Sequence, residues 1–268
     1  MSGQFRRVGR RLGAVVAGAA LVVIALPAAT AGAAGAPYTC QGGSIPAGSY
    51  GSVVVAGFCQ VDSGNVNVSG SFTVNPDAGL LAAFGGSDLH VGMNFIVGSG
   101  AIVVLGCEPE AFTCFNDPDQ NVGTLSTHHT IGLNFAATGA LMVLAHNNQI
   151  GGNATQTGGG GGVTCDLFPL GPDGPPAYST WEDNSIARNA SVTGVQTCWM
   201  GFIRNTVGNN VNYSNNVLAD PDGNEVVTNT VGRNLNCSGN DPSPQIGDSD
   251  GDANVIGGQA TGQCTNIN

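Results

Sequence analysis

The chain lacks lysine entirely and has few charged residues of any kind. Charged residues make up 9% of its 268 residues, with 18 Asp and Glu against seven arginines. Four of those arginines lie within the first eleven residues, so the rest of the chain sets three arginines against 18 carboxylates, a formal charge of −15. A surface of that sign repels polyanions, which argues against nucleic acid and anionic membranes as partners.

Long apolar runs are also scarce, and the one clear example is at the N-terminus. Four arginines precede the apolar segment 12–27, and Ala29-Thr30-Ala31 follows as a cleavage site. This pattern predicts a signal peptide over residues 1–31 and hence a secreted, extracellular protein. No later segment is continuously apolar over the roughly 20 residues of a transmembrane helix, so we expect no membrane span.

Cysteine is well represented, with eight residues in all. An even number of cysteines in an exported chain predicts disulfides, although eight allow about 105 connectivities. We favour sequential pairing, in which each bridge closes a local loop or joins neighbouring repeats. The expected bridges are Cys40 with Cys59, Cys107 with Cys114, Cys165 with Cys198, and Cys237 with Cys264.

A sequence repeat gives the strongest indication of fold. The stretch NTVGNNVNYSNN (205–216) recurs as NTVGRNLNCSGN (229–240), 24 residues later. With its Val taken as position zero, the pattern has eight copies, at Val68, Val91, Ile131, Ile150, Ile186, Val207, Val231 and Ile256. The steps are 19 to 25 residues except for two, of 40 and 36, which hold an insertion or a degenerate copy. A period near 20 favours one coil of a parallel β-helix over a propeller blade of about 40 residues.

Amide side chains recur at two fixed positions of these copies, and we call each set of equivalent residues a file. Position three is an amide in seven of the eight copies, at Asn94, Asn134, Asn153, Asn189, Asn210, Asn234 and Gln259. A second file lies two residues before position zero, at Asn148, Asn184, Asn205, Asn229 and Asn254, where His129 substitutes in one copy. Stacked identical amides can bond to each other from coil to coil, so the pattern predicts asparagine ladders. Position four is apolar, and we expect positions zero and four to face inward.

The motif of residues 229–240 and the ending GGQATGQC of residues 257–264 resemble exported right-handed parallel β-helix proteins of high-GC Gram-positive bacteria, similar in architecture to pectate lyases. The resemblance implies an all-β, single-stranded right-handed solenoid of about 8–9 coils. It implies no particular activity, because this fold hosts lyases, hydrolases, adhesins and inert surface proteins.

The expected organisation is a signal peptide (1–31), an N-terminal cap segment (32–59) and a β-helix (60–268). Loops interrupt the β-helix near residues 107–121 and 157–180, where the repeat pattern breaks. Insertions in solenoids often lie on the binding face. A glycine run within the second loop is equally typical of a slack connector, so both interpretations stay open.

Residues for catalysis are few. A lyase acting on acidic sugars needs a basic residue, and Arg188 and Arg233 occupy position two of their copies on one expected edge. Glu182 and Asp183 are the nearest carboxylates for a glycoside hydrolase, which uses a pair of acids. The alternative interpretation is structural: solvated arginines, with Arg204 paired to Asp183 because each lies three residues before position zero in adjacent copies.

Two further patterns suggest ligands. Asp248, Asp250 and Asp252 alternate around a glycine and could bind Ca²⁺, although Asp-Gly is also a favoured turn and the spacing departs from that of an EF-hand. Trp181 borders the second loop and could stack on a sugar ring, whereas a buried position is the alternative.

On balance the sequence favours a secreted, non-catalytic β-solenoid with a structural, cell-surface or glycan-interacting role, and polysaccharide or cell-wall glycan as partner. The alternative is a polysaccharide lyase or glycoside hydrolase on the same scaffold. The pattern demands no cofactor apart from the Ca²⁺ alternative, and it sets neither the ligand nor the oligomeric state.

Overall fold

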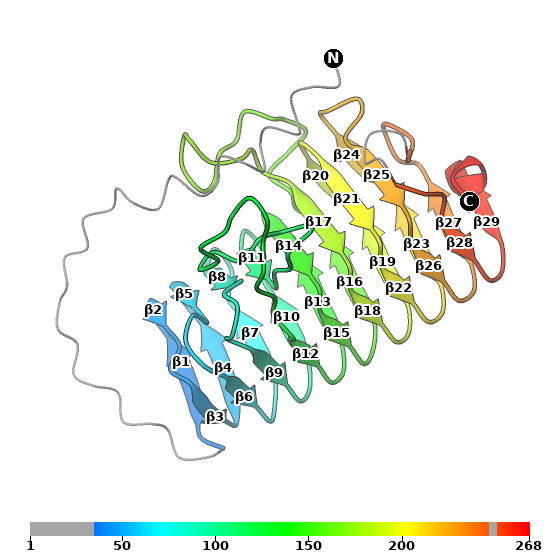
Figure 1. Cartoon of the computed structure of the whole chain (residues 1–268). Helices are drawn as coiled ribbons and strands as arrows, with labels where there is room; N and C mark the ends of the chain where they lie inside the picture. Colours follow the sequence, from blue (N-terminus) through cyan, green and yellow to red (C-terminus); the bar gives the residue numbers. More distant parts are fainter. Residues whose placement is uncertain (1–34, 247–250) are drawn as a thin grey trace.

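The computed structural model describes residues 35–246 and 251–268, so the expected signal peptide lies outside the described residues. Short strands stack in parallel into three long sheets that share a common axis, and the molecule is an elongated parallel β-helix (Figure 1). The predicted fold class is confirmed. Among the described residues, no helix is long and apolar enough to cross a membrane.

Three sheets, which we term A, B and C, account for most strands. Sheet A has ten strands: β1 (Pro37–Cys40), β4 (Ser52–Val55), β7 (Phe72–Val74), β10 (Phe95–Val97), β13 (Phe135–Thr138), β16 (Ala154–Thr157), β19 (Ala190–Thr193), β23 (Val211–Ser214), β27 (Leu235–Ser238) and β29 (Ala260–Gly262). Sheet B has eight: β2 (Gly43–Ser44), β5 (Phe58–Gln60), β8 (Gly79–Ala82), β11 (Ile102–Leu105), β14 (Met142–His146), β17 (Ser179–Glu182), β21 (Met200–Ile203) and β25 (Asn224–Val227).

Sheet C has nine strands: β3 (Gly48–Tyr50), β6 (Val66–Val68), β9 (Leu89–Val91), β12 (Thr130–Ile131), β15 (Gln149–Ile150), β18 (Ser185–Ile186), β22 (Thr206–Val207), β26 (Thr230–Val231) and β28 (Val255–Ile256). A small two-stranded sheet joins β20 (Gln196–Thr197) and β24 (Val217–Leu218), and the 3₁₀ helix η3 (Gln263–Asn266) ends the rod. The chain visits A, B and C in turn and then enters the next coil.

The coils begin earlier than the repeat predicted. Strand β1 already pairs with β4, and β3 pairs with β6, so residues 37–59 belong to the β-helix rather than to a separate cap. The repeat pattern failed there because Tyr50 and Val53 align with Val68 and Phe72, which makes the first turn one residue shorter. A shortened turn has no place for the position-three amide.

The predicted register is confirmed in every copy. Position zero faces inward from sheet C, and position four is the first inward residue of sheet A. Phe72, Phe95 and Phe135 stack, with ring centroids 5.2 and 5.0 Å apart. Ile131 pairs directly with Val91 across the 40-residue step, so that step holds an insertion and not a degenerate copy.

Both predicted amide ladders are present. In the second file, Asn205 Oδ1 accepts hydrogen bonds from the backbone N–H and the Nδ2 of Asn184, at 3.1 and 3.0 Å, and its own Nδ2 donates to the carbonyl of Trp181 at 2.8 Å. Asn184, Asn205 and Asn229 are fully buried, so these bonds satisfy backbone groups that water cannot reach. The position-three file is linked in the same way but lies half-exposed.

A third amide file was missed by the sequence analysis. Asn216 accepts from the backbone of Val195, Asn240 accepts from Asn216, and Gln263 accepts from Asn240, at 2.9 to 3.1 Å. It fills the turn between sheets A and B in the last coils. Its signal was present, because Asn216 and Asn240 end the two quoted stretches at matching positions.

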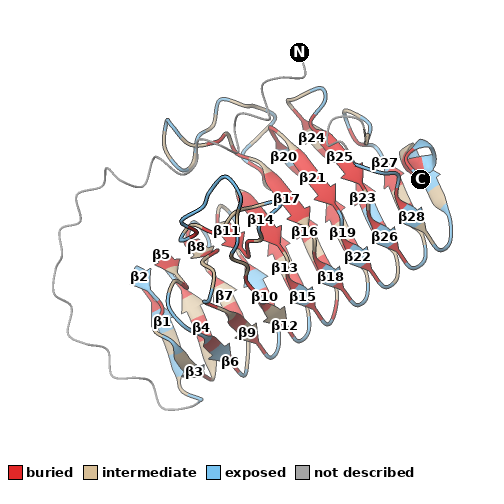
Figure 2. Ribbon diagram, in the orientation of Figure 1, coloured by how far each residue is buried: buried red, intermediate tan, exposed pale blue. Residues whose placement is uncertain are grey.

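The two loops pack against the middle strands of sheet B and cover their outer face, whereas β2 at the start of the sheet is exposed. A second apolar cluster joins Val104, Met142 and Leu144 on the outer face of sheet B to loop residues that include Phe112, Phe115, Leu125 and Leu167. Strands β14, β21 and β25 are therefore buried along their whole length (Figure 2). The first loop is thus packed on the sheet, whereas the second is anchored through residues such as Leu167 and leaves Phe168 and Leu170 exposed.

All eight cysteines form the sequential disulfides that we favoured. Cys40–Cys59 and Cys237–Cys264 join coils at the two ends of the rod, where each terminal coil has a neighbour on one side only. Cys107–Cys114 closes a ring at the base of the first loop, and Cys165–Cys198 fastens the second loop to the following coil. The bridges therefore lie where stacking alone gives the least support.

Candidate functional site

The sequence-predicted catalytic residues lie on two different edges of the β-helix. Glu182 ends β17 and Asp183 follows it, at the turn from sheet B to sheet C. Arg188 and Arg233 lie at the turn from sheet C to sheet A, where backbone bonds connect Arg188 to Asn209 and Asn209 to Arg233. The expected arginine edge is present, but it does not join the two acids in one site.

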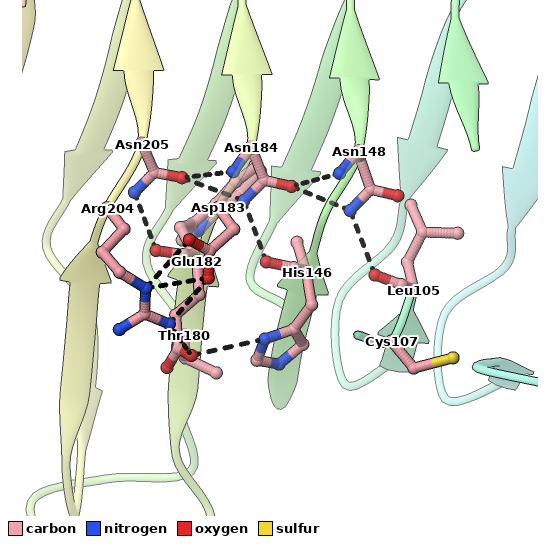
Figure 3. Close-up of polar contacts among 12 residues, drawn as sticks. Leu105, Cys107, His146, Asn148, Thr180, Glu182, Asp183, Asn184, Arg204 and Asn205 are labelled. Atoms are coloured by element: carbon pink, nitrogen blue, oxygen red, sulfur yellow. Dashed lines mark hydrogen bonds and ion pairs between the residues drawn. The ribbon is translucent and has the colours of Figure 1, made fainter. Parts of the chain in front are cut away.

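Arg204 is the cation that contacts those acids, as the structural interpretation predicted. Its Nε and Nη2 donate to the two carboxylate oxygens of Asp183 at 2.8 and 2.6 Å, and Nη2 lies 3.4 Å from Glu182 Oε2 (Figure 3). Asp183 and Arg204 each adopt a positive φ, of 55° and 52°, at equivalent positions of adjacent coils. Equivalent residues of stacked coils lie about 4.8 Å apart, so opposite charges there form a pair.

Glu182 is embedded further into the same cluster. It accepts a hydrogen bond from Thr180 Oγ1 at 2.5 Å, and its Oε2 lies 3.5 Å from His146 Nδ1. Burial alone raises the pKa of Glu182, but His146, the Thr180 hydroxyl and Arg204 together outweigh burial and bring the pKa to about 2. Only 13% of its side chain is exposed. Its carboxylate is therefore engaged by its neighbours and has little surface left for a substrate.

Glu108 is a cluster member that the sequence analysis missed. It follows Cys107 at the base of the first loop and lies against Asp183, two coils further along. Burial raises its pKa to about 8, and the hydrogen bond and charge of Asp183 add to that effect. Glu108 lies outside the repeat, so no register placed it near another residue. Asp183 thus lies between Glu108 and Arg204 and contacts both. This arrangement is that of a structural charge network, whereas a glycoside hydrolase needs two acids on opposite sides of a cleft.

The proposed Ca²⁺ site lies only partly within the described residues. Asp248 and Asp250 lie outside them. Asp252 is bound through its backbone to Thr228, and within residues 35–246 and 251–268 no group of three or more acidic, His or Cys side chains could hold a metal ion. Trp181 lies inside the coil with 1% exposure, where its Nε1 donates to Gln156 at 2.8 Å. No face of that indole is open to a sugar ring, which corrects the binding hypothesis.

The outer face of sheet A is a continuous surface, and its strands carry no charged residue. None of its ten strands contains Asp, Glu, Lys, Arg or His. In the five coils from residue 134 to 238, three files of residues on the outer face form a regular array, which we call the sheet A grid; Ser214 is its one buried member. Its files are Asn134, Asn153, Asn189, Asn210 and Asn234; Ala136, Thr155, Ser191, Asn212 and Asn236; and Thr138, Thr157, Thr193, Ser214 and Ser238.

Strand geometry sets the spacing of the grid. Coils are about 4.8 Å apart, and alternate residues of one strand are about 6.6 Å apart. Fourteen of the fifteen positions carry a hydroxyl or an amide, and the bonds of the amide ladder fix one file rigidly. The grid therefore presents donors and acceptors at two constant intervals, with little conformational entropy to lose on binding.

Sheet C adds a shallow trough of about 490 Å³ over the first coils. Its outward file there is Ser49, Asn67, His90 and Thr130, and the glycines of the adjacent turn leave the trough open. His90 Nδ1 lies 3.0 Å from Thr130 Oγ1. This second surface is also uncharged apart from the imidazole.

No protein-family model matches this chain, and comparison with curated proteins and with solved structures gives no significant match. The resemblance to exported β-helix proteins stays a prediction, and function has to be inferred from geometry.

Proposed function

We propose that this protein is an exported, non-catalytic β-solenoid that binds a neutral polysaccharide along the outer face of sheet A. The observation that carries the proposal is the sheet A grid, an uncharged array of hydroxyls and amides at repeating intervals. Polysaccharides display hydroxyls at repeating intervals too, so one rigid face can form many hydrogen bonds to one ordered ligand. Each is weak, but together they give avidity.

Charge limits the ligand further. Beyond residue 31 the chain carries three arginines and 18 carboxylates. An acidic polysaccharide would meet the repulsion of the whole molecule. A neutral glycan escapes that repulsion because sheet A, unlike the loops over sheet B, has no carboxylate to desolvate.

The test is retention on insoluble neutral polysaccharides such as cellulose, chitin and a β-glucan, measured by depletion of the protein from the supernatant. Thr157→Glu places a charge in the grid, and Thr206→Glu places the same charge at an exposed Thr on sheet C. We expect Thr157→Glu to weaken retention at least about tenfold, since an unpaired charge must be desolvated on contact. Thr206→Glu should bind like the unmodified protein.

Two results would contradict the proposal. Equal losses in both variants, or no retention on any of the polymers, would remove the grid as the binding surface. Release of reducing or unsaturated sugars would favour the lyase or hydrolase alternative, and Glu182→Gln, Arg188→Ala and Arg233→Ala would then assign the residues responsible.

A further inference from the structure

The first loop, residues 106–129, is attached to the β-helix along two margins of different chemistry; we call it the cover loop. Its margin toward the earlier coils is held by uncharged bonds. Phe115 N–H donates to the Ala83 carbonyl at 3.0 Å, and the Asn116 side chain exchanges two hydrogen bonds with the backbone of Gly85, at 2.8 and 3.0 Å. None of these groups titrates between pH 5 and 10.

The opposite margin, toward the later coils, is made by residues 108–112. Here the Phe112 ring stacks on His146 with centroids 4.5 Å apart, and Glu108 contacts Asp183. Glu108 Oε1 is buried without a hydrogen-bond partner in the described part of the chain. Both ring nitrogens of His146, a residue with 1% exposure, also lack a hydrogen bond, although Nδ1 faces Glu182 at 3.5 Å. This margin thus depends on the Phe112 stack and the Glu108 contact, together with one uncharged hydrogen bond from Asn147 Nδ2 to the Thr127 carbonyl at 3.0 Å.

Two carboxyl groups in contact hold one proton between them at neutral pH, because two negative charges at that distance repel. Arg204 donates to both carboxylate oxygens of Asp183, whereas burial raises the pKa of Glu108, so the shared proton resides on Glu108. The other titratable groups facing Glu108 are Glu182, His146 and Arg204 on the coils, with Tyr178 behind Glu182 and the exposed Glu110 on the loop itself.

We propose that residues 108–112 are a pH-dependent latch: protonated Glu108 donates a hydrogen bond to Asp183, and loss of that proton releases this margin of the cover loop. The released carboxylate is repelled by Asp183 and Glu182, and the Arg204 guanidinium is already occupied. The margin bonded to Ala83 and Gly85 stays attached, so the loop opens on one side.

Opening uncovers an apolar surface. Val104, Met142 and Leu144 on the outer face of sheet B are 4%, 0% and 2% exposed beneath the closed loops. The sign follows from the raised pKa of Glu108, about 8 against an ordinary 4.5. The stabilisation that protonated Glu108 gives to the closed loop is complete below pH 4.5, and it is lost as the pH rises through about 8.

Two measurements on the whole protein test the latch. The sequence has four glutamates, at 108, 110, 182 and 225. Selective ¹³C labelling of the glutamate carboxyls therefore gives four signals, and we expect one of them, absent in Glu108→Gln, to titrate near pH 8. Hydrogen exchange, corrected for its intrinsic pH dependence, should rise about tenfold in residues 108–114 between pH 6.5 and 9.5 but not in the sheet A strands.

Glu108→Gln keeps a donor that does not titrate, so its 108–114 segment should exchange equally at both pH values. Glu110→Gln, at an exposed position of the same loop, should behave like the unmodified chain. The proposal is overturned if the Glu108 signal titrates near pH 4.5, or if exchange in the unmodified protein is the same at both pH values. The carboxyl titration needs only the unmodified protein and decides the matter even if the glutamine variant does not fold.

Discussion

At the scale of single residues, the buried amides do most to determine how the chain folds. Asn205 bonds to both neighbouring coils at once, since it accepts from Asn184 and donates to the carbonyl of Trp181 in the preceding coil, and donates to Asn229 Oδ1 in the next. An asparagine fits because it carries donors and acceptors on one short planar group. The preceding residue has a positive φ in each of these turns, as at Asn147, Asp183, Arg204 and Thr228. That strain persists because the ladder fixes the turn around it.

We expect Asn205→Ala to lower the free energy of unfolding by about 3 kcal/mol, because it leaves the Trp181 carbonyl and two Asn184 donors buried without partners. Asn209→Ala is the control: that side chain is half-exposed in the adjacent turn, and the change should stay within about 0.5 kcal/mol. Denaturant midpoints measure both. Similar midpoints for the two variants would show that the ladder adds little.

The His129 imidazole takes the place of an asparagine side chain in the second amide file. Its Nδ1 accepts from the Leu89 N–H at 2.9 Å, and its Nε2 bonds to the Ala82 carbonyl at 2.8 Å, as a buried asparagine does elsewhere in the file. Burial is the main reason that its pKa falls to about 4, from an ordinary 6.5. Folding therefore favours the neutral ring, and the stability that depends on it is complete above pH 6.5 and declines as pH falls toward 4.

His129→Asn should remove that decline. Between pH 7 and pH 5, the free energy of unfolding of the unmodified protein should fall by about 2 kcal/mol relative to that of the variant. The reason is that His129 gains a proton in the unfolded chain but stays neutral in the folded chain. His128→Asn, one residue earlier and exposed, gives the matched comparison and should leave the pH dependence unchanged. Parallel stability curves for the unmodified protein and His129→Asn would contradict this account of the ring.

At the scale of elements, the repeat predicted strands and register well in two sheets and poorly in the third. Positions zero to four define the end of sheet C and the start of sheet A, and their residues pair as expected. Sheet B follows turns of variable length and its middle strands are buried on both faces, so their residues show no alternation to read. Trp181, on a sheet B strand, was misplaced for that reason. Glu108 lies on a loop with no repeat at all, and only the folded chain brings it to Asp183.

Strand β10 offers a direct test of inward and outward alternation. Phe95 is completely buried between Phe72 and Phe135, whereas the next residue, Ile96, is 41% exposed. Phe95→Ala should cost about 3 to 5 kcal/mol through the cavity it leaves, and Ile96→Ala within about 0.5 kcal/mol. Thermal or denaturant unfolding distinguishes them, and a large loss in Ile96→Ala would mean that the outer face of sheet A packs against something in solution.

At the scale of the whole molecule, charge is segregated by face. The acid cluster of Glu108, Glu182 and Asp183 and the cover loop lie over or beside sheet B, while the sheet A strands contain no Asp, Glu, Lys, Arg or His. The composition gives the net charge, but it does not predict where the charges lie around the rod. Their position depends on the sheet over which each loop folds. The proposed glycan surface and the proposed latch therefore occupy different sides of the rod and can be disabled separately.

Within the three sheets each coil bonds only to the coils on either side, and this gives the molecule a length that can be edited. One copy of 24 residues, such as 207–230, begins and ends at equivalent places in sheet C. Deleting or duplicating such a segment removes or adds one rung, about 4.8 Å, and leaves every remaining layer with neighbours of its own kind. Unequal recombination between such copies would therefore lengthen or shorten the rod by whole coils without other changes. Related proteins could then differ in the length of their outer face through the number of coils alone.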